Sequence, residues 1–148
     1  MLDKLGGGDV AQRTFIMLKP DAVEKRLVGR ILARIEGEEM RIVALKAIKL
    51  GREGAERLYA VHRGKPFFRD LVDYVTSGPI VAAVIEGVDA VGEVRRVCGV
   101  TDPSKAGAGT IRGDFGGSIT KNAIHAADSA ESAGREIAIF FRPDELLS

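Results

Sequence analysis

The chain has 148 residues, with 22 basic and 21 acidic side chains and a formal net charge of +1. The length suits one domain, and 45% hydrophobic with 29% charged residues is typical of globular proteins, not disordered ones. The near-neutral charge argues against broad non-specific binding to DNA or membranes, while one cysteine and two histidines exclude an internal disulfide and a three-histidine metal centre.

The start of the chain carries no sign of targeting. Residues 1–12 include Gly6-Gly7-Gly8 and no long apolar run, which argues against a secretory signal. The densest apolar stretch, residues 80–85, is far shorter than the roughly 20 residues that a membrane helix needs. We therefore expect a flexible arm over residues 1–12, a single domain over 13–148, and a cytoplasmic protein with no membrane partner.

Hydrophobic periodicity divides the rest of the chain into strands and helices. In order, it predicts a strand at 14–18, a helix at 27–35, a half-exposed strand at 41–50, helices at 53–61 and 67–75, a strand at 80–85 and a helix at 88–97. No period survives from 99 to 118, where glycine is dense, so we expect a long loop of the kind that is more often functional than inert.

The end of the chain predicts one more helix and one more strand. The helix begins near Asp128, whose carboxylate caps it, with Glu131 three residues on as its capping-box partner. The apolar residues of 136–141 then predict a last strand. Without the extra short helices the order is β-α-β-β-α-β or close to it, so we expect an α+β fold with a ferredoxin-like core, an antiparallel sheet covered by helices. Such a fold hosts many functions, and the function must come from a site.

Several common catalytic motifs are absent from the sequence. There is no Walker A loop, H-E-x-x-H, C-x-x-C or G-x-S-x-G, and Arg112 stands where a dinucleotide-binding fingerprint beginning at Gly107 needs its third glycine. What remains is a set of cations near glycines and hydroxyls. Lys19 follows a buried strand, and Arg95 and Arg112 flank or lie in the glycine-rich loop, where guanidinium groups could bind phosphate. Taken singly, each is more often an ordinary surface cation.

The two histidines carry a further signal. If residues 122–125 form a helical turn, Asn122 and His125 share one face. A histidine can act as a base, a ligand or a nucleophile, and a nucleophile needs an orienting partner, for which Asp128 and Glu136 are candidates. Taken alone, His125 and His62 are each more often structural than catalytic.

Several segments, taken together, resemble the nucleoside diphosphate kinase family. They are Arg13-Thr14-Phe15-Ile16-Met17-Leu18-Lys19-Pro20-Asp21, Tyr59-Ala60-Val61-His62-Arg63-Gly64-Lys65-Pro66-Phe67-Phe68, Ser77-Gly78-Pro79, Gly109-Thr110-Ile111-Arg112-Gly113-Asp114-Phe115 and Asn122-Ala123-Ile124-His125. The resemblance covers nearly the whole chain after Gln12. It implies a hexamer or a tetramer, the hexamer being favoured. It also implies an enzyme that moves the γ-phosphate of a nucleoside triphosphate to a nucleoside diphosphate through a phosphohistidine, with broad base specificity.

The resemblance also implies roles for single residues. His125 would be the nucleophile, and Glu136 would hold its imidazole in the reactive orientation. The phosphates would be bound by Lys19, Arg95, Thr101 and Arg112, with Tyr59 supporting Lys19 and the terminal phosphate. The ribose would be bound by Asn122 and Lys19, and the base by Phe67, Leu71 and Ile119. Mg²⁺ would bridge the phosphates, with Asp128 nearby and contacting it through water.

One position departs from the family pattern. Family members usually carry a serine where this chain has Ala127, and that hydroxyl supports the carboxylate partner of the nucleophile. The departure leaves open an alternative, a module that binds nucleotide or single-stranded nucleic acid with weak transfer activity. A generic RNA-binding domain is disfavoured, because the RNP1-type run is missing. We expect activity to persist, because the nucleophile and the phosphate ligands remain, with nucleotides as substrates and nucleic acid not required.

Overall fold

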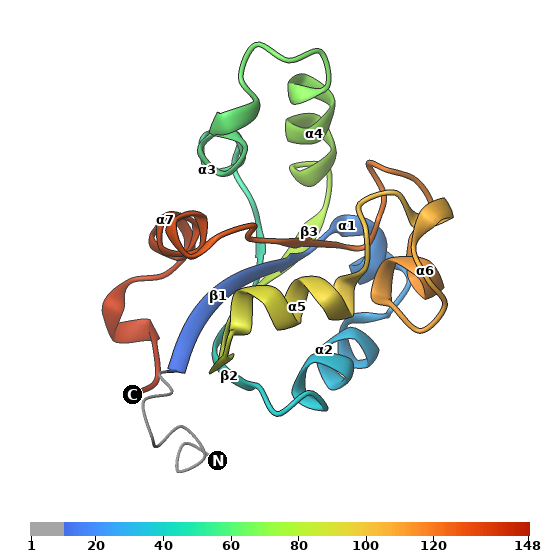
Figure 1. Cartoon of the computed structure of the whole chain (residues 1–148). Helices are drawn as coiled ribbons and strands as arrows, with labels where there is room; N and C mark the ends of the chain where they lie inside the picture. The colour runs from blue at the N-terminus through green and yellow to red at the C-terminus, as the bar shows by residue number, and fades with distance from the viewer. Residues whose placement is uncertain (1–10) are drawn as a thin grey trace.

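The computed structural model describes residues 11–148, which are organised around one antiparallel sheet (Figure 1). Its strands are β1 (Ala11–Leu18), β2 (Arg41–Lys49), β3 (Pro79–Val88) and β4 (Ile124–Ala126). Their spatial order is β2-β3-β1-β4, and every neighbouring pair is antiparallel. This order and pairing confirm the expected ferredoxin-like α+β fold.

Helices cover both faces of the sheet. They are α1 (Pro20–Glu24), α2 (Val28–Glu36), α3 (Arg52–Leu58), α4 (Phe68–Val75), α5 (Ala90–Cys98), α6 (Ile111–Phe115) and α7 (Ala130–Phe140). Figure 1 shows α2 and α5 over one face with α6 beside them, and α3, α4 and α7 over the other. Short 3₁₀ turns lie at Ala60–His62, Pro103–Lys105 and Pro143–Glu145. No helix in the part that the structure describes is long and apolar enough to cross a membrane.

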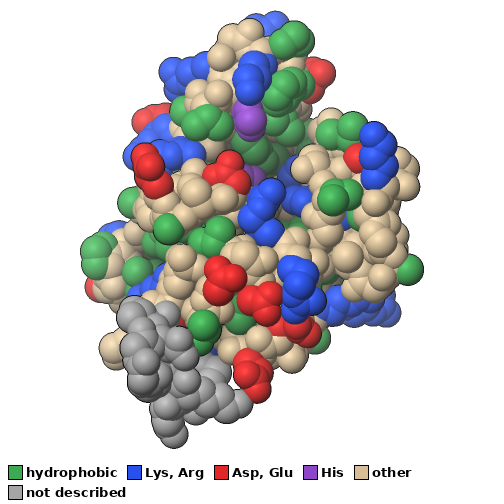
Figure 2. Space-filling view, viewed as in Figure 1, with side chains coloured by type: hydrophobic (Ala, Val, Ile, Leu, Met, Phe, Trp, Pro, Cys, Tyr) green, Lys and Arg blue, Asp and Glu red, His purple; other side chains and the backbone are tan. Residues whose placement is uncertain are grey.

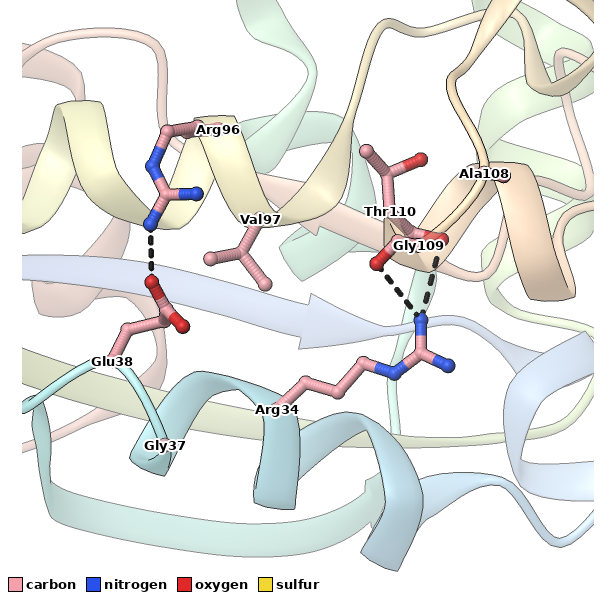
Figure 3. Close-up of a pocket in the computed structure, with 8 residues that line it drawn as sticks. All are labelled: Arg34, Gly37, Glu38, Arg96, Val97, Ala108, Gly109 and Thr110. Carbon is pink, nitrogen blue, oxygen red and sulfur yellow. Dashed lines mark hydrogen bonds and ion pairs between the residues drawn. The ribbon is translucent and has the colours of Figure 1, made fainter.

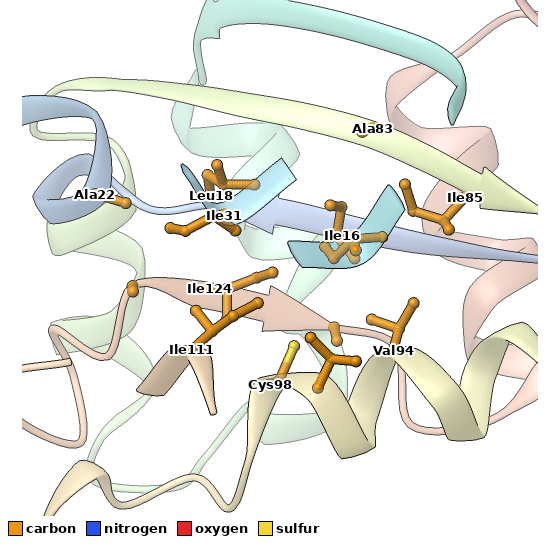
Figure 4. Close-up of a cluster of buried hydrophobic side chains, with 14 of the residues drawn as sticks. Ile16, Leu18, Ala22, Ile31, Ala83, Ile85, Val94, Cys98, Ile111 and Ile124 are labelled. Atoms are coloured by element: carbon orange, nitrogen blue, oxygen red, sulfur yellow. The ribbon is translucent and has the colours of Figure 1, made fainter. Parts of the chain in front are cut away.

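The central strand β1 explains why there are two hydrophobic cores. Successive side chains of a strand point to opposite faces, and β1 is apolar on both. Ile16 and Leu18 enter the core beneath α2 and α5, drawn in Figure 4. Phe15 and Met17 enter the other core, beneath α3, α4 and α7. The register of every neighbouring strand against β1 therefore decides which side chains reach which core.

The end of the chain differs from the prediction in three ways. The fourth strand is β4 at residues 124–126, so residues 122–125 do not form a helical turn. The predicted strand at 136–141 is wrong, because α7 runs through most of it as far as Phe140. The helix cap is also different, since the Ser129 side chain accepts the hydrogen bond from the Ser132 backbone, and Asp128 and Glu131 do not form a capping box.

The physical reason is that short apolar runs carry little periodicity. A run of six residues fits a strand and two turns of helix about equally well. A three-residue strand such as β4 has almost no alternation of its own to detect.

The predicted loop and arm also need adjustment. Residues 99–118 contain α6, whose N-cap Thr110 accepts a hydrogen bond from the Gly113 backbone, as well as a 3₁₀ turn. Of the predicted arm, residues 1–10 lie outside the described residues, while Ala11 and Gln12 belong to β1. The Gln12 side chain accepts a hydrogen bond from the Val91 backbone at 2.9 Å, which ties the start of β1 to α5.

Candidate active site

His125 lies in β4 and faces a carboxylate from the last helix. It pairs with Met17 of β1, and directly paired residues point to the same face, so its ring lies on the α7 side of the sheet. Its Nε2 lies 2.8 Å from Oε1 of Glu136, a buried residue of α7. The other oxygen, Oε2, lies 3.4 Å from a guanidinium nitrogen of Arg135. A buried carboxylate with these two partners holds the imidazole in one orientation.

Aromatic rings enclose the imidazole. The ring of Tyr59 meets that of His125 edge-on at 5.7 Å, and Phe15 lies 6.0 Å away. The Tyr59 hydroxyl is buried and has no hydrogen-bond partner among the described residues. Burial, together with the charge of Glu136, raises the pKa of Tyr59, so its hydroxyl stays protonated and can donate a hydrogen bond to a ligand.

Two buried cations, Lys19 and Arg112, donate hydrogen bonds to the backbone of β4 and of the segment just before it. Lys19 follows β1, and its ammonium donates to the Thr120 carbonyl at 3.2 Å. Arg112 in α6 donates to the carbonyls of Gly99 and Ile124, each at 2.8 Å. Burial, and then the charge of Arg112, lowers the pKa of Lys19 to about 8. Neither cation forms a salt bridge within residues 11–148, so both can receive an anionic ligand.

Further polar side chains contact β4 or lie just before and after it in the chain. Arg95 reaches the Ala126 carbonyl at 3.5 Å, and the Asn122 amide donates to the Thr101 carbonyl at 3.0 Å. The Asn122 Oδ1 is buried without a partner in the described part of the chain. Asp128 is exposed, and its pKa is lowered chiefly by hydrogen bonding from the Ser132 side chain, so its carboxylate stays ionised at neutral pH. Figure 2 shows the two histidines one below the other, the lower recessed beside blue cationic side chains.

The predicted base-binding residues, Phe67, Leu71 and Ile119, differ in their exposure to solvent. Phe67 and Ile119 are both exposed apolar side chains, and the Phe67 ring lies 5.1 Å from that of His62. Leu71 is half-buried and packs against the core that contains Tyr59. Leu71 therefore contributes to the core, and Phe67 has the freer face.

Three further side chains, those of Asp21, Tyr74 and Arg135, support this site and were not among the predicted ones. The buried carboxylate of Asp21 accepts hydrogen bonds from the Tyr74 hydroxyl and the Ala123 backbone, and Arg135 contacts Glu136. Of these, only Asp21 could have been suspected from the sequence, because it is an acidic residue directly after Lys19 and Pro20. Ala127 lies in a small apolar cluster with Val91 and Ala133, and Glu136 still meets His125 in its presence.

A separate groove of about 550 Å³ lies between α2, α5 and the glycine-rich loop (Figure 3). Its two arginines are already paired. Arg34 donates to the carbonyls of Gly109 and Thr110 and contacts Asp114 at 2.7 Å, while Arg96 contacts Glu38. These bonds attach the loop to α2, and α5 to the turn after α2, and leave little free charge for a ligand.

A family model and the curated relatives both match this chain and carry the same name. Residues 12–146 match the family model described as nucleoside diphosphate kinase. Among curated relatives named nucleoside diphosphate kinase, that of Ignicoccus hospitalis is 57% identical, covering 92% of this chain and 92% of the relative. That of Thermus thermophilus is 56% identical, covering 92% of this chain and 99% of the relative.

Solved structures are similar throughout the fold. The nucleoside diphosphate kinase of Aquifex aeolicus has a TM-score of 0.91 at 46% identity, covering 93% of this chain and 100% of that one. A halophilic nucleoside diphosphate kinase from Halobacterium salinarum, solved in complex with CDP, has a TM-score of 0.91 at 44% identity, covering 94% of this chain and 93% of that one. Relatives named as kinases do not favour the alternative of a binding module. By sequence and by fold, the chain belongs to the nucleoside diphosphate kinase family.

Proposed function

We propose that this chain transfers the γ-phosphate of a nucleoside triphosphate to a nucleoside diphosphate, with His125 as the nucleophile. The observation that carries the proposal is the pairing of His125 with the buried Glu136, beside two buried cations that have no salt-bridge partner among residues 11–148. Phosphoryl transfer needs charge neutralisation and positioning more than covalent elaboration. This set of residues supplies both.

The hydrogen bond to Glu136 supports a specific tautomer. An ionised carboxylate accepts, so Nε2 carries the proton and Nδ1 keeps its lone pair. Among the described residues, Nδ1 has no hydrogen-bond partner. In the first half-reaction the Nδ1 lone pair attacks the γ-phosphorus, and the bond from that phosphorus to the bridging oxygen breaks. The nucleoside diphosphate leaves with that electron pair.

The second half-reaction reverses the first with a different nucleotide. A terminal oxygen of the acceptor diphosphate attacks the phosphorus on His125, and the phosphorus–nitrogen bond breaks. The Nε2 proton stays on the ring throughout, facing Glu136. Lys19 and Arg112 would neutralise the phosphate oxygens, and the unpartnered hydroxyl of Tyr59 would donate to the terminal phosphate.

The donor set also fits Mg²⁺ that arrives with the nucleotide. Among residues 11–148 no group of three or more His, Cys, Asp or Glu side chains is placed to hold a metal. Mg²⁺ commonly binds through one or two carboxylates, several waters and the substrate phosphates, so one ionised and exposed carboxylate is a suitable contact. Asp128 would hold the ion through water. When bound, Mg²⁺ would neutralise charge on the phosphates.

Broad base specificity is supported by the chemistry of the residues proposed to bind the base. Phe67 offers an exposed aromatic face, and stacking tolerates every nucleobase because each has a π-face. Asn122 and Lys19 would bind the ribose hydroxyls, and the buried Asn122 Oδ1 that lacks a partner in the described chain is available to accept from one of them. Leu71 and Ile119 would complete the apolar surroundings of the base.

The assembly and location of the protein are also proposals. Family membership supports a homo-oligomer, a hexamer in preference to a tetramer, and light scattering on a size-exclusion column distinguishes them. The single cysteine, Cys98, is free and buried, which is compatible with the reducing cytoplasm.

The decisive experiment is labelling with ATP carrying a labelled γ-phosphate, without an acceptor. We expect an acid-labile, alkali-stable phosphoprotein that any nucleoside diphosphate discharges. His125→Ala should abolish labelling, whereas His62→Ala should retain it. His62 is a matched control, because its ring lies 6.4 Å from that of Tyr59, on the same side of the site. Labelling that survives His125→Ala would refute the assignment, and an unlabelled intact protein would point to the binding module.

A further inference from the structure

The buried carboxylate of Asp21 connects three segments around the candidate active site. Its Oδ2 accepts a hydrogen bond from the Ala123 backbone at 3.0 Å, and its Oδ1 accepts one from the Tyr74 hydroxyl at 2.8 Å. It lies two residues after Lys19, and it forms no salt bridge within the described chain. An unpaired, buried charge is costly, so both hydrogen bonds must be kept.

The first bond holds a strained turn. Ala123 has φ +77°, a left-handed conformation that residues other than glycine rarely adopt. Its N–H is held by Asp21, and its carbonyl accepts from the Lys19 backbone at 2.9 Å. The segment that carries Lys19 therefore fixes both backbone groups of this residue. Ala123 separates Asn122 from Ile124 and His125, so the turn determines the direction in which β4 begins.

The second bond reaches the helix beside the base-binding residues. Tyr74 lies in α4, which begins directly after Phe67 and contains Leu71. Burial and the hydrogen bond to Asp21 raise the pKa of Tyr74, so its hydroxyl remains a donor across the physiological range. The ammonium of Lys121 lies 5.6 Å from the centre of the Tyr74 ring, so the segment before β4 also meets α4.

We infer that Asp21 is a positioning residue for phosphoryl transfer, with two separable effects. Through Ala123 it holds His125 and Lys19 in register, and through Tyr74 it holds α4 against the catalytic strand. This inference rests on the proposed function. It follows from the geometry because transfer depends on sub-ångström placement, and a displacement of about 1 Å costs about 10²-fold in rate.

The two bonds predict different kinetic effects. Asp21→Ala removes both and should lower the rate of phosphohistidine formation at saturating ATP by about 10²-fold. Asp21→Asn should stay within about tenfold, because its carbonyl can accept from Ala123 while its amide donates to the Tyr74 oxygen. Tyr74→Phe removes only the α4 bond and should raise KM by about three- to tenfold, with kcat changed less than about threefold.

A double variant separates positioning from general stability. Glycine adopts φ near +77° without a steric penalty, so Asp21→Ala with Ala123→Gly should recover at least about tenfold of the lost rate. Loss of a merely stabilising contact would not be corrected in this way, because Ala123→Gly removes a buried methyl group and adds no contact. Circular dichroism and melting temperature verify folding of each variant.

A spectroscopic readout makes the test independent of activity. In protein labelled with ¹⁵N-histidine, the ring signals of His125 should shift in Asp21→Ala and return in the double variant, while those of His62 stay within the wild-type range. An unshifted His125, or a double variant without recovery, overturns the positioning role. If Asp21→Ala does not fold, Tyr74→Phe decides, and a fall in kcat with unchanged KM overturns it. Failure of wild-type labelling would refute the proposed function alone, because the His125 signals still report the geometry.

Discussion

Two parts of the site differ sharply in exposure. The proposed catalytic floor, meaning Lys19, Arg112, His125 and Glu136, lies in α6, β4 and α7 and directly after β1, and the two cations and the carboxylate are 4–6% exposed. The nucleotide rim, meaning Phe67, Ile119, Arg95 and Thr101, is open to solvent, with Phe67 45% and Ile119 58% exposed. The floor makes hydrogen bonds to fixed backbone carbonyls and a carboxylate, whereas the rim offers mainly apolar surface and flexible charge.

Under the proposed function, this difference in exposure separates the residues that act on the phosphate from those that bind the base. Charges that stabilise a transition state work best when they are already oriented and shielded from water, as in the floor. Recognition of every nucleobase needs the reverse, a surface that offers stacking but no fixed hydrogen-bond pattern. Substitutions in the floor should therefore change kcat, and substitutions in the rim should change KM.

The strongest test of this separation is Glu136→Gln. The amide keeps the size of the side chain but removes the negative charge that faces Nε2 of His125. We expect kcat to fall by about 10²-fold with little change in KM, as for loss of a single preorganised electrostatic partner. Rapid-quench measurement of phosphohistidine formation checks this. Glu131→Gln is the control, since it makes the same change at an exposed residue of the same helix, and its effect should stay within about threefold.

Phe67→Ala tests the rim. Stacking of a base on an aromatic side chain contributes about 1–3 kcal/mol, so KM should rise by about 5- to 160-fold with kcat nearly unchanged. The increase should be similar for adenine, guanine, cytosine and uracil nucleotides. Leu147→Ala is the control, because it removes an exposed apolar side chain near the C-terminus, and it should have no effect. Losses that differ strongly between bases would show that the rim reads base edges, contrary to the comparison.

The pH dependence of the activity tests the contribution of Lys19 to the floor. The pKa of Lys19 is lowered to about 8, so the ammonium loses its proton as the pH rises through this value. We expect kcat/KM to fall by about tenfold per pH unit above pH 8, because the neutral amine cannot neutralise the charge of the phosphate in the transition state. Burial raises the pKa of Tyr59 and, to about 11, that of Cys98, so neither titrates in this window.

A rise in pH lowers the activity through Lys19 but raises the stability of the fold through the same residue. Between pH 8 and 10.5 the unfolded chain binds more protons at Lys19 than the folded chain, so this residue's contribution to the free energy of unfolding rises with pH. Lys19→Arg keeps the charge, so the activity loss near pH 8 should disappear from its pH profile. A profile that keeps the loss in Lys19→Arg would assign it to another group.

The smallest expected effect concerns Ala127. It is buried in an apolar cluster, and Glu136 already meets His125 and Arg135 without a hydroxyl at this position. Ala127→Ser should therefore change kcat by less than about threefold, the scale of an ordinary mild substitution. Steady-state kinetics and a melting curve on the same preparation check this. A gain of tenfold or more would mean that the missing serine limits the orientation of Glu136.

Much of the fold was predictable from local pattern. The apolar runs of β1 and β3 and the helical spacing of α2 and α5 are long and strongly periodic, so tertiary contacts reinforce the local preference. The β4–α7 region was not predictable, because three strand residues carry no period and the apolar residues near Phe140 fit either structure. The assignment of the last strand to 136–141 followed from this ambiguity.

The sequence by itself determined the family, the fold class and the candidate nucleophile, because short ordered segments such as Asn122-Ala123-Ile124-His125 match a family pattern together. Only the tertiary structure decided how His125 is presented. Its pairing with Met17 directs the ring toward α7 and Glu136, and a shift of one residue would direct it into the opposite core. The Asp21 bond to Ala123, between residues 102 positions apart, fixes the turn that precedes this strand. Such contacts depend on strand register and burial, which no local pattern encodes.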